Sequence, residues 1–320
     1  MPSPNEPLPG VELESSPCPL DCPPGDDPVL ESYDYHNHLP GKFHVVRCRT
    51  CGLMRTDPRP TAATIHLYYP ADYAPYTRST VQPQGRRSAW RALLRKATPF
   101  YNQHLPPLPP GYLLEVGCAV GAFLHHMAQL GWQVEGIEPG LQAAASARSL
   151  GYPVQPLPLE SAAPPLQPPD LVVAWMALEH LHQPVIALQK LAAWSKPGAW
   201  LALSVPNCAS FDFRLFKGTG YALHLPAHLY HFTPHTLRRV LWQGGWRVER
   251  IFHQRTLGNF FGSLGYTLRQ RGHANRLVDW LVAYPQNGKM HLLFYPLGFL
   301  LGLFGQTGRM TIWARKPEQG

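Results

Sequence analysis

The 320-residue sequence has little charge, few cysteines and no long apolar segment. Its first ten residues, MPSPNEPLPG, contain neither a basic start nor an apolar core, which argues against a signal peptide. The longest apolar run, LLFYPLGFLLGLF (292–304), has 13 residues, too few to span a bilayer as one helix. Hydrophobic residues make up 45% of the chain, a normal share for a globular protein. We therefore expect a cytoplasmic globular protein.

Acidic residues are scarce in the last third of the chain. Residues 1–205 contain 14 Lys and Arg against 16 Asp and Glu, whereas residues 206–320 contain 14 against 4. Residues 206–320 therefore carry a net positive charge. This charge favours an anionic partner, which is a phosphorylated substrate, a lipid headgroup or nucleic acid. A basic surface that only maintains solubility is the alternative.

Proline is abundant and unevenly placed. The 36 prolines cluster before residue 30, at 106–110 and at 153–169, and proline donates no backbone hydrogen bond, so these segments indicate loops and linkers. Residues 1–30 are expected to be disordered apart from their two cysteines. The stretch RRSAWRALLRKATPFYNQHL (86–105) has apolar residues at helical spacing and predicts a basic helix before a proline-rich linker.

From residue 111 the sequence alternates between strand and helix patterns. Buried strands are predicted at GYLLEVG, WQVEGIEP, PDLVVAWM and AWLALSVPN, and helices at GAFLHHMAQLG, LQAAASARSLG and QPVIALQKLAAWSKPG. A further helix, HTLRRVLWQGG, and two strands, WRVERIFH and RMTIWARKP, follow. This alternation predicts an α/β, Rossmann-like doubly wound sheet with helices on both faces.

A glycine turn joins the first of these strands to its helix. In LLEVGCAVGAF, Gly117 and Gly121 let the backbone approach a ligand closely, and the helix start offers free N–H groups. The G-x-x-x-G spacing differs from the dinucleotide fingerprint. The second strand ends at Glu138, a position suited to a ribose diol. A domain that binds another nucleotide, or none, is the alternative.

Residues 111–205 resemble the class I S-adenosylmethionine-dependent methyltransferases. EVGCAVG resembles their first motif, VEGIEP the acidic motif of the second strand and DLVVAWMALEHLHQP the fourth-strand motif. Ala119 stands where this family often has glycine. The resemblance implies S-adenosylmethionine as cofactor, with Glu138 on the ribose hydroxyls. The pair at 159–160 is our choice for the position that contacts the adenine. The residues that the resemblance implies for cofactor binding are Glu115, Gly117, Cys118, Gly121, Glu138, Pro139, Leu159, Glu160 and Met176.

Four of the six cysteines form two close pairs. CPLDC and RCRTCGLM provide Cys18, Cys22, Cys48 and Cys51, and four thiolates suit a closed, tetrahedral structural zinc site. The first pair is spaced C-x-x-x-C, one residue longer than usual. Separate buried cysteines are the alternative. If Cys18 or Cys22 is not a ligand, the substitutes are His36, His38 and His44.

The cysteine pairs, followed by DPRPTAATIHLYYPADYAPY, resemble a methyltransferase subfamily with an N-terminal zinc module. The resemblance implies methylation of carbon or oxygen on sugars, polyketides or lipid-linked glycans. Tyr73 and Tyr76 then become candidates for substrate binding, with ordinary aromatic packing as the alternative. The expected domains are a zinc module with a disordered start (1–85), the basic helix and linker (86–110), the methyltransferase domain (111–255 and 309–317) and an apolar helical insertion (256–308).

The stretch YALHLPAHLYHFTPHTL (221–237) holds four histidines at spacings of four, three and four. Pro226 and Pro234 argue against one continuous helix that would place all four on one face. The stretch resembles a subfamily motif in which Glu-His precedes a Phe-Thr-Pro helix start, with Ala227 here in place of the glutamate. Thr233 is expected to cap the following helix and Pro234 to occupy its first position.

Methyl transfer needs an aligned acceptor and, for a hydroxyl or an acidic carbon, a base that removes a proton. His228 is the first candidate for that base and His231 the second. His180, in LEHL at the end of the fourth strand, is a candidate for positioning substrate or for a structural role. A zinc site in this histidine segment is the alternative. His224 and His235 are expected to be solvated or structural.

Three functions compete at this level. The first is methyl transfer to a small-molecule acceptor, expected to be anionic or lipid-linked. The second is nucleic-acid (RNA) methylation, which the fourth-strand end AWMALEH disfavours because it lacks an Asn/Asp-Pro-Pro-aromatic motif. The third is a catalytically inactive scaffold that binds the cofactor.

The insertion at 256–308 is more apolar than a short connection needs, and Arg269, Arg271, Arg276 and Lys289 flank its apolar stretches. An apolar surface beside cations favours a peripheral membrane contact through 286–305, at the inner face of the membrane. Packing onto the domain or onto a second copy, giving a homodimer, is the alternative.

Overall fold

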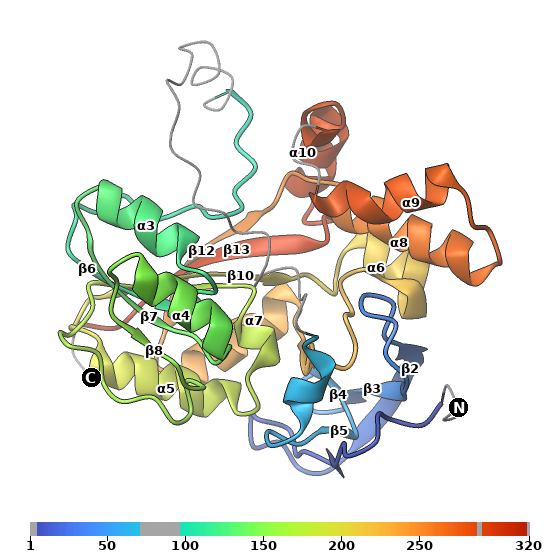
Figure 1. Cartoon of the computed structure of the whole chain (residues 1–320), viewed down its shortest axis with the longest axis horizontal. Helices are drawn as coiled ribbons and strands as arrows, with labels where there is room; N and C mark the ends of the chain where they lie inside the picture. The colour runs from blue at the N-terminus through green and yellow to red at the C-terminus, as the bar shows by residue number, and fades with distance from the viewer. Residues whose placement is uncertain (1–4, 71–96, 287–289, 319–320) are drawn as a thin grey trace.

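The computed structural model describes residues 5–70, 97–286 and 290–318. Its centre is a seven-stranded sheet of order β12-β13-β10-β9-β6-β7-β8 (Figure 1). β13 runs antiparallel to both of its neighbours, and the other pairs are parallel. This is the predicted Rossmann-like α/β fold. The strands are β6 (Tyr112–Val116), β7 (Gln133–Ile137), β8 (Val154–Gln155), β9 (Leu171–Trp175), β10 (Trp200–Pro206), β12 (Arg247–His253) and β13 (Arg309–Arg315).

Helices cover both faces of this sheet. The side chains of β10 point alternately to the two faces, and each set packs beneath a different pair of helices. Leu201, Leu203 and Val205 belong to the core beneath α5 (Pro184–Trp194) and α7 (Pro234–Gln243), whereas Ala202 belongs to the core beneath α3 (Ala122–Gln129) and α4 (Leu141–Ser149). Successive strand side chains point to opposite faces, so an apolar strand supplies both cores. The start of α7 is as predicted, because Thr233 accepts a hydrogen bond from the Thr236 N–H and Pro234 occupies the first turn.

The N-terminal residues form a second sheet, of order β11-β4-β3-β2, with a short β1–β5 pair beside it. The expectation of a disordered start was wrong for the described residues from 5 to 30, because Cys18 and Leu20 pack into the main core and a strand begins at Asp26. β11, from the histidine segment, pairs with β4, so this module and the methyltransferase domain share a sheet. The bounds are β1 (Leu13–Glu14), β2 (Asp26–Tyr33), β3 (Lys42–Cys48), β4 (Met54–Thr56), β5 (Arg59–Pro60), the 3-10 helix η1 (Ile65–Tyr68) and β11 (Tyr230–His231).

The predicted basic helix lies mostly outside the described residues, as do Tyr73 and Tyr76. For residues 98–105 the helix prediction was wrong, since this stretch consists of turns and irregular backbone. Its backbone carbonyl groups accept hydrogen bonds from residues in or next to the central sheet instead. The indole N–H of Trp313 donates to the carbonyl oxygen of His104 at 2.7 Å, and the backbone N–H of Arg255 donates to that of Phe100 at 3.2 Å.

The insertion before the last strand is helical, as predicted. It contains α8 (Gly258–Gln270), α9 (Arg276–Ala283) and α10 (Tyr295–Leu303), which lie at the upper right of Figure 1 near the short α6 (Phe211–Phe216). Gly265 permits close packing of α8 and α9, since a Cβ there would lie 2.8 Å from a methyl carbon of Val282. Among the described residues, no helix combines the length and the apolar character that a membrane crossing requires.

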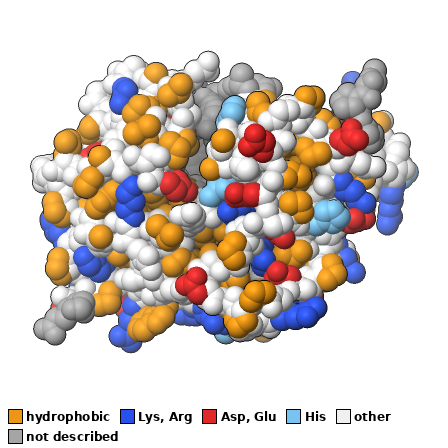
Figure 2. Space-filling model, turned by 90° about the horizontal axis from the view of Figure 1, so that it is seen from below, with side chains coloured by type: hydrophobic (Ala, Val, Ile, Leu, Met, Phe, Trp, Pro, Cys, Tyr) orange, Lys and Arg blue, Asp and Glu red, His pale blue; other side chains and the backbone are white. Residues whose placement is uncertain are grey.

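A solvent-open groove of about 670 Å³ lies along α7 and the start of β12. Arg238, Arg239 and Arg247 line it together with the exposed Trp242. None of the residues predicted to bind cofactor or acceptor lines this groove, so it is separate from the predicted site. On the face that Figure 2 shows, cationic, acidic and apolar side chains are interspersed, and neither charge forms a continuous field.

Candidate active site and cysteine cluster

The glycine turn after β6 is built as its sequence predicts. Gly117 and Gly121 have φ angles of 74° and 79°, and Ala119 between them has a φ of 46°. These are left-handed conformations that favour glycine, so Ala119 keeps the family's turn at some cost in strain. A Cβ on Gly121 would lie 2.9 Å from the Cβ of Ala147, which shows how closely α4 approaches the turn.

Glu138 fastens this turn to the end of β7. One carboxylate oxygen accepts the backbone N–H of Ala119 at 2.8 Å, and the other accepts that of Gly140, also at 2.8 Å. Carboxylate oxygens each have two lone pairs, so ribose hydroxyls can still donate to Glu138. Glu115, at the same edge, is fully buried, and burial together with the charge of Glu138 raises its pKa well above the usual range.

The other predicted cofactor residues surround the same strand ends, but not all in the expected way. The Cys118 thiol is buried against Gly136 of β7, whose added Cβ would lie 2.6 Å from the sulfur, so only its backbone faces the turn. Met176 follows β9 with a φ of 55°. Leu159 is buried in the core, whereas Glu160 and Pro139 are exposed. The Lys190 ammonium donates to the backbone carbonyls of both residues of the 159–160 pair.

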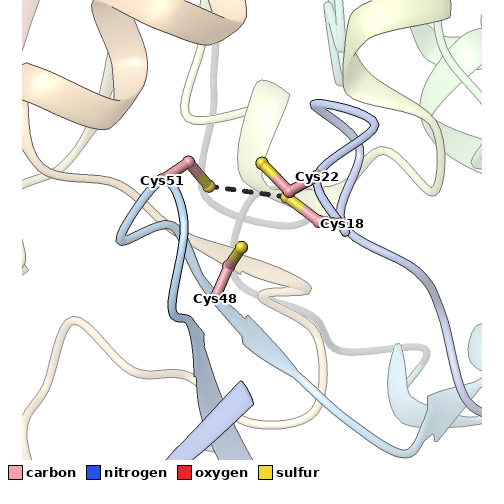
Figure 3. A group of neighbouring side chains, drawn as sticks. All are labelled: Cys18, Cys22, Cys48 and Cys51. Atoms are coloured by element: carbon pink, nitrogen blue, oxygen red, sulfur yellow. Dashed lines mark hydrogen bonds between the residues drawn. The ribbon is translucent and has the colours of Figure 1, made fainter. Parts of the chain in front are cut away.

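The four cysteines predicted to bind metal come together (Figure 3). All four sulfur atoms lie within 4.8 Å of one another, Cys18 and Cys51 are 3.5 Å apart, and none forms a disulfide. Tetrahedral zinc with Zn–S bonds of about 2.3 Å places sulfurs about 3.8 Å apart, so the arrangement suits that ion. Backbone N–H groups support the cluster, since that of Leu53 donates to the Cys51 sulfur at 3.4 Å. The histidine substitutes are not needed for a four-ligand site.

A cluster of imidazoles lies between the N-terminal module and the end of β9, with His228 buried and His36, His180 and His224 half-buried. His36, between β2 and β3, stacks on His224 with ring centroids 4.1 Å apart. His228 lies 4.9 Å from the His224 ring and 4.7 Å from the His180 ring. His36 was considered only as a zinc ligand, and nothing local in the sequence marks its place here.

His180 and His228 have defined tautomers. Nδ1 of His228 lies 2.9 Å from the carbonyl oxygen of Ala222, and Nδ1 of His180 lies 2.9 Å from that of Ala227. A carbonyl only accepts, so each Nδ1 carries the proton and each Nε2 keeps a basic lone pair. The Tyr69 hydroxyl also lies 2.9 Å from Nδ1 of His180. Sequence reasoning missed Tyr69, although it stands four positions before the predicted Tyr73 in the sequence.

His231 lies outside this cluster, on β11. Its Nε2 is 3.1 Å from the hydroxyl oxygen of Thr56, which itself donates to the carbonyl of His228 at 2.8 Å. Nε2 of His231 therefore donates to Thr56, which fits a role in joining the two modules. Burial lowers its pKa to about 3. His235 is exposed on α7. Of the two candidate bases, the geometry favours His228.

Glu179 is the second residue that sequence reasoning passed over, although it adjoins His180 in LEHL. It lies in the 3-10 helix η2 (Leu178–His180) with no exposed surface, and burial raises its pKa to about 8. A carboxylate oxygen lies 4.0 Å from Nε2 of His228. Its backbone carbonyl accepts the N–H of Leu229 at 2.8 Å, which fixes the histidine segment against η2.

Comparison with known proteins decides the family. Residues 86–251, just over half of the chain, match the family model described as a methyltransferase domain. The chain belongs to this methyltransferase family. It therefore carries a class I S-adenosylmethionine-dependent methyltransferase domain, and the glycine turn with Glu138 is the part of the fold that suits this cofactor.

Relatives match over part of their length. A ubiquinone biosynthesis O-methyltransferase from Albidiferax ferrireducens is 33% identical over 133 residues, which cover 38% of this chain and 52% of that protein. One from Bordetella avium is 30% identical over 139 residues, covering 39% and 56%. A methyltransferase structure from Mesorhizobium loti has 16% identity, covers 71% of this chain and 96% of that one, and gives a TM-score of 0.43. The chain spans about half the length of the curated relatives named here.

These relatives bear on the expected acceptor. Their names give O-methylation in ubiquinone biosynthesis, so the expectation of a sugar or lipid-linked glycan acceptor gains no support from them. RNA methylation gains none either. The N-terminal sheet and the cysteine cluster lie before the residues that the family model matches, so the match does not test the subfamily resemblance.

Proposed function

We propose that this protein methylates a hydroxyl oxygen of a small quinone-type aromatic acceptor, with His228 as the base. The observation that carries the base assignment is the fixed tautomer of His228, whose Nε2 lone pair lies in a buried cluster at the end of β9. The names of the relatives support oxygen as the methylated atom and a quinone precursor as the acceptor.

The surroundings of His228 suit a flat ring. Tyr221 and Tyr266 stack with centroids 5.7 Å apart, and His36 lies 4.5 Å from the Tyr221 ring. Such rings favour offset or edge contacts with an aromatic acceptor. S-adenosylmethionine supplies the methyl group when it is bound. The chain holds it through the glycine turn and Glu138, and His228 accepts the hydroxyl proton of the acceptor.

Turnover with defined acceptors tests this function. Purified protein with S-adenosylmethionine is given 3,4-dihydroxybenzoate, 4-hydroxybenzoate or UDP-glucose, and methylated products are identified by mass spectrometry. We expect an O-methylated phenol. His228→Ala should lower turnover ~10²–10⁴-fold, whereas His235→Ala, on exposed α7, should not. Methylation of the nucleotide sugar alone would refute the aromatic acceptor, and the absence of any turnover by folded, cofactor-binding protein would support the inactive scaffold.

We also propose that Cys18, Cys22, Cys48 and Cys51 bind one structural zinc ion. Four thiolates fill a tetrahedral shell, so the ion would have no open position for chemistry. Cys18 belongs to the main core and the cluster closes one end of β3, which makes metal binding part of the folding of this region.

Finally, we propose a peripheral membrane contact through residues 286–305, which include α10. Arg271 and Arg276, which precede this segment in the sequence, are exposed and can meet anionic headgroups. Lys289, the other flanking cation, lies outside the described residues. The exposed apolar side chains in the described part of this segment are Leu292, Leu293, Leu297, Phe299, Leu300, Leu303 and Phe304.

A further inference from the structure

The histidine that we assign as base lacks the neighbouring glutamate of the motif it resembles, because position 227 is alanine. Ala227 is buried, with 1% of its surface exposed, and its carbonyl is engaged by His180. A buried imidazole without an anionic neighbour is a weak base, because burial disfavours the imidazolium form. Burial lowers the pKa of His228 well below its usual range. The site therefore needs a negative charge from elsewhere in the fold.

We propose that Glu179 supplies this charge, as a positioning residue that shares one proton with His228 and stabilises its imidazolium form. The inference rests on the proposed role of His228. One Glu179 oxygen lies 4.0 Å from Nε2 of His228, and neither carboxylate oxygen has a hydrogen-bond partner among the described residues. Burying a carboxylate without hydrogen-bond partners costs free energy, and burying an imidazolium alone does so too. Placing the two opposite charges side by side lowers both costs.

Proton transfer from the acceptor to this pair breaks one bond and forms one bond. As the O–H bond of the acceptor breaks, an N–H bond forms at Nε2 of His228, and the acceptor oxygen becomes the nucleophile. The positive charge that appears on the imidazole is offset by the Glu179 carboxylate. Nδ1 keeps its proton throughout, because it donates to the Ala222 carbonyl.

Other charged and titratable groups face this pair, and they determine how it titrates. Arg309, on β13, acts on Glu179 and favours its ionised form, and the Cys208 thiol faces the same carboxyl. His180, His224 and His36 lie around His228, His231 acts on it from β11, and any positive charge on these four rings disfavours its imidazolium. With pKa values lowered by burial, these imidazoles stay neutral near pH 7, so Glu179 is the nearby group whose ionised form adds negative charge. Because burial also raises the pKa of Glu179 to about 8, the pair reaches the form with a neutral His228 and an ionised Glu179 only when it loses its shared proton.

Histidine NMR tests the pair without an acceptor. The full-length protein is labelled with ¹⁵N-histidine, and the ring signals of wild type, Glu179→Gln and Glu179→Asp are followed from pH 5 to 9, with His228→Asn to assign the peak. We expect His228 to titrate within this range in wild type, and to stay neutral down to pH 5 in Glu179→Gln. Glu179→Asp should retain a titration, because it retains the charge.

Calorimetry with S-adenosylmethionine shows that each variant is folded, and cofactor affinity should stay within about threefold. An acceptor that the protein methylates adds a second measurement. There Glu179→Gln should lower kcat about 10–100-fold with KM unchanged, and the acid limb of kcat/KM should move to lower pH.

Two results would overturn the assignment. One is an unchanged His228 titration in a folded Glu179→Gln protein. The other is a metal ion at this place, since ligand atoms of Glu179, His180 and His228 lie within 4.8 Å of one another. A metal equivalent that remains in a Cys48→Ser protein and is lost in Glu179→Gln would replace the shared proton. If none of the acceptors is methylated, the proposed function is refuted, but the NMR result on Glu179 and His228 still stands.

Discussion

The ring of His36 stacks on the ring of His224, with centroids 4.1 Å apart and planes inclined by 25°. His36 lies between the first long strands of the N-terminal module, and His224 lies 188 positions later, in the segment before α7. Tyr266 of α8 reaches the same place, with its ring 5.4 Å from that of His36. Three parts of the chain thus enclose the histidine cluster, and the N-terminal module forms part of its wall.

Replacing Glu138 should weaken cofactor binding. Glu138→Gln removes a charge that accepts backbone N–H bonds in the glycine turn and is placed to accept ribose hydroxyls. We expect a loss of about 1–3 kcal/mol in S-adenosylmethionine binding by calorimetry. Glu249→Gln, at an exposed position of β12, is the matched control and should bind normally. Equal affinity in both variants would show that this strand end does not hold the ribose.

Elemental analysis should find about one zinc ion per chain. Cys48→Ser should lose it and loosen the N-terminal sheet first, which hydrogen exchange can follow, because thiolate binding is coupled to folding there. Cys208→Ser is the matched control, since Cys208 is equally buried but lies outside the cluster. Wild-type protein without metal, with Cys48 and Cys51 freely alkylated while folded, would refute the zinc proposal.

Buried neutral histidines should make the protein acid-sensitive. Burial lowers the folded-state pKa of His231 to about 3, against about 6.5 in an unfolded chain. The unfolded state therefore binds the proton first, and the stabilising effect is present above pH 6.5 and is lost as the pH falls below it. Between pH 7.5 and 5.5 this one group should cost about 1 kcal/mol of unfolding free energy.

Urea unfolding at the two pH values measures that dependence. His231→Asn should be less stable than wild type at pH 7.5 but should show a smaller loss on acidification. His235→Asn, at an exposed position, should show the wild-type dependence. Zinc content is measured in parallel, so that metal release is not mistaken for protonation. An unchanged pH dependence in His231→Asn would mean that this imidazole is not held neutral.

The apolar segment 286–305 should bind anionic vesicles. Protein co-sedimented with phosphatidylglycerol-containing vesicles at low salt should pellet, and a triple variant, Leu293→Ser, Leu300→Ser and Phe304→Ser, should remain in solution. Leu141→Ser and Leu166→Ser together form the matched control, because these leucines are as exposed but lie elsewhere. Absence of binding, with light scattering that gives a dimer in wild type and a monomer in the triple variant, would instead assign the surface to a second copy.

Local patterns in the sequence were enough for the fold and for the glycine turn that Glu138 holds. The buried strands, the glycine turn and Glu138 follow from periodicity and from residues that act on their immediate neighbours, and the Thr233–Pro234 helix start is equally local. The two cysteine pairs are also local units, since each pair is joined by one short turn. The disordered start and the helix to residue 105 were wrong because packing partners far along the chain order those segments.

The arrangement of the histidines was decided by tertiary structure. His228 and His231 are three residues apart and chemically alike, yet pairing of β11 with β4 directs one ring to Thr56, while the other joins His180 and His224. Glu179 becomes relevant only where η2 lies against the histidine segment, 49 positions away. Such contacts depend on how sheets and turns stack in space, which spacing along a single sequence does not encode. The sequence alone therefore determined the methyltransferase fold and its glycine turn, and the folded chain selected which histidine faces a carboxylate.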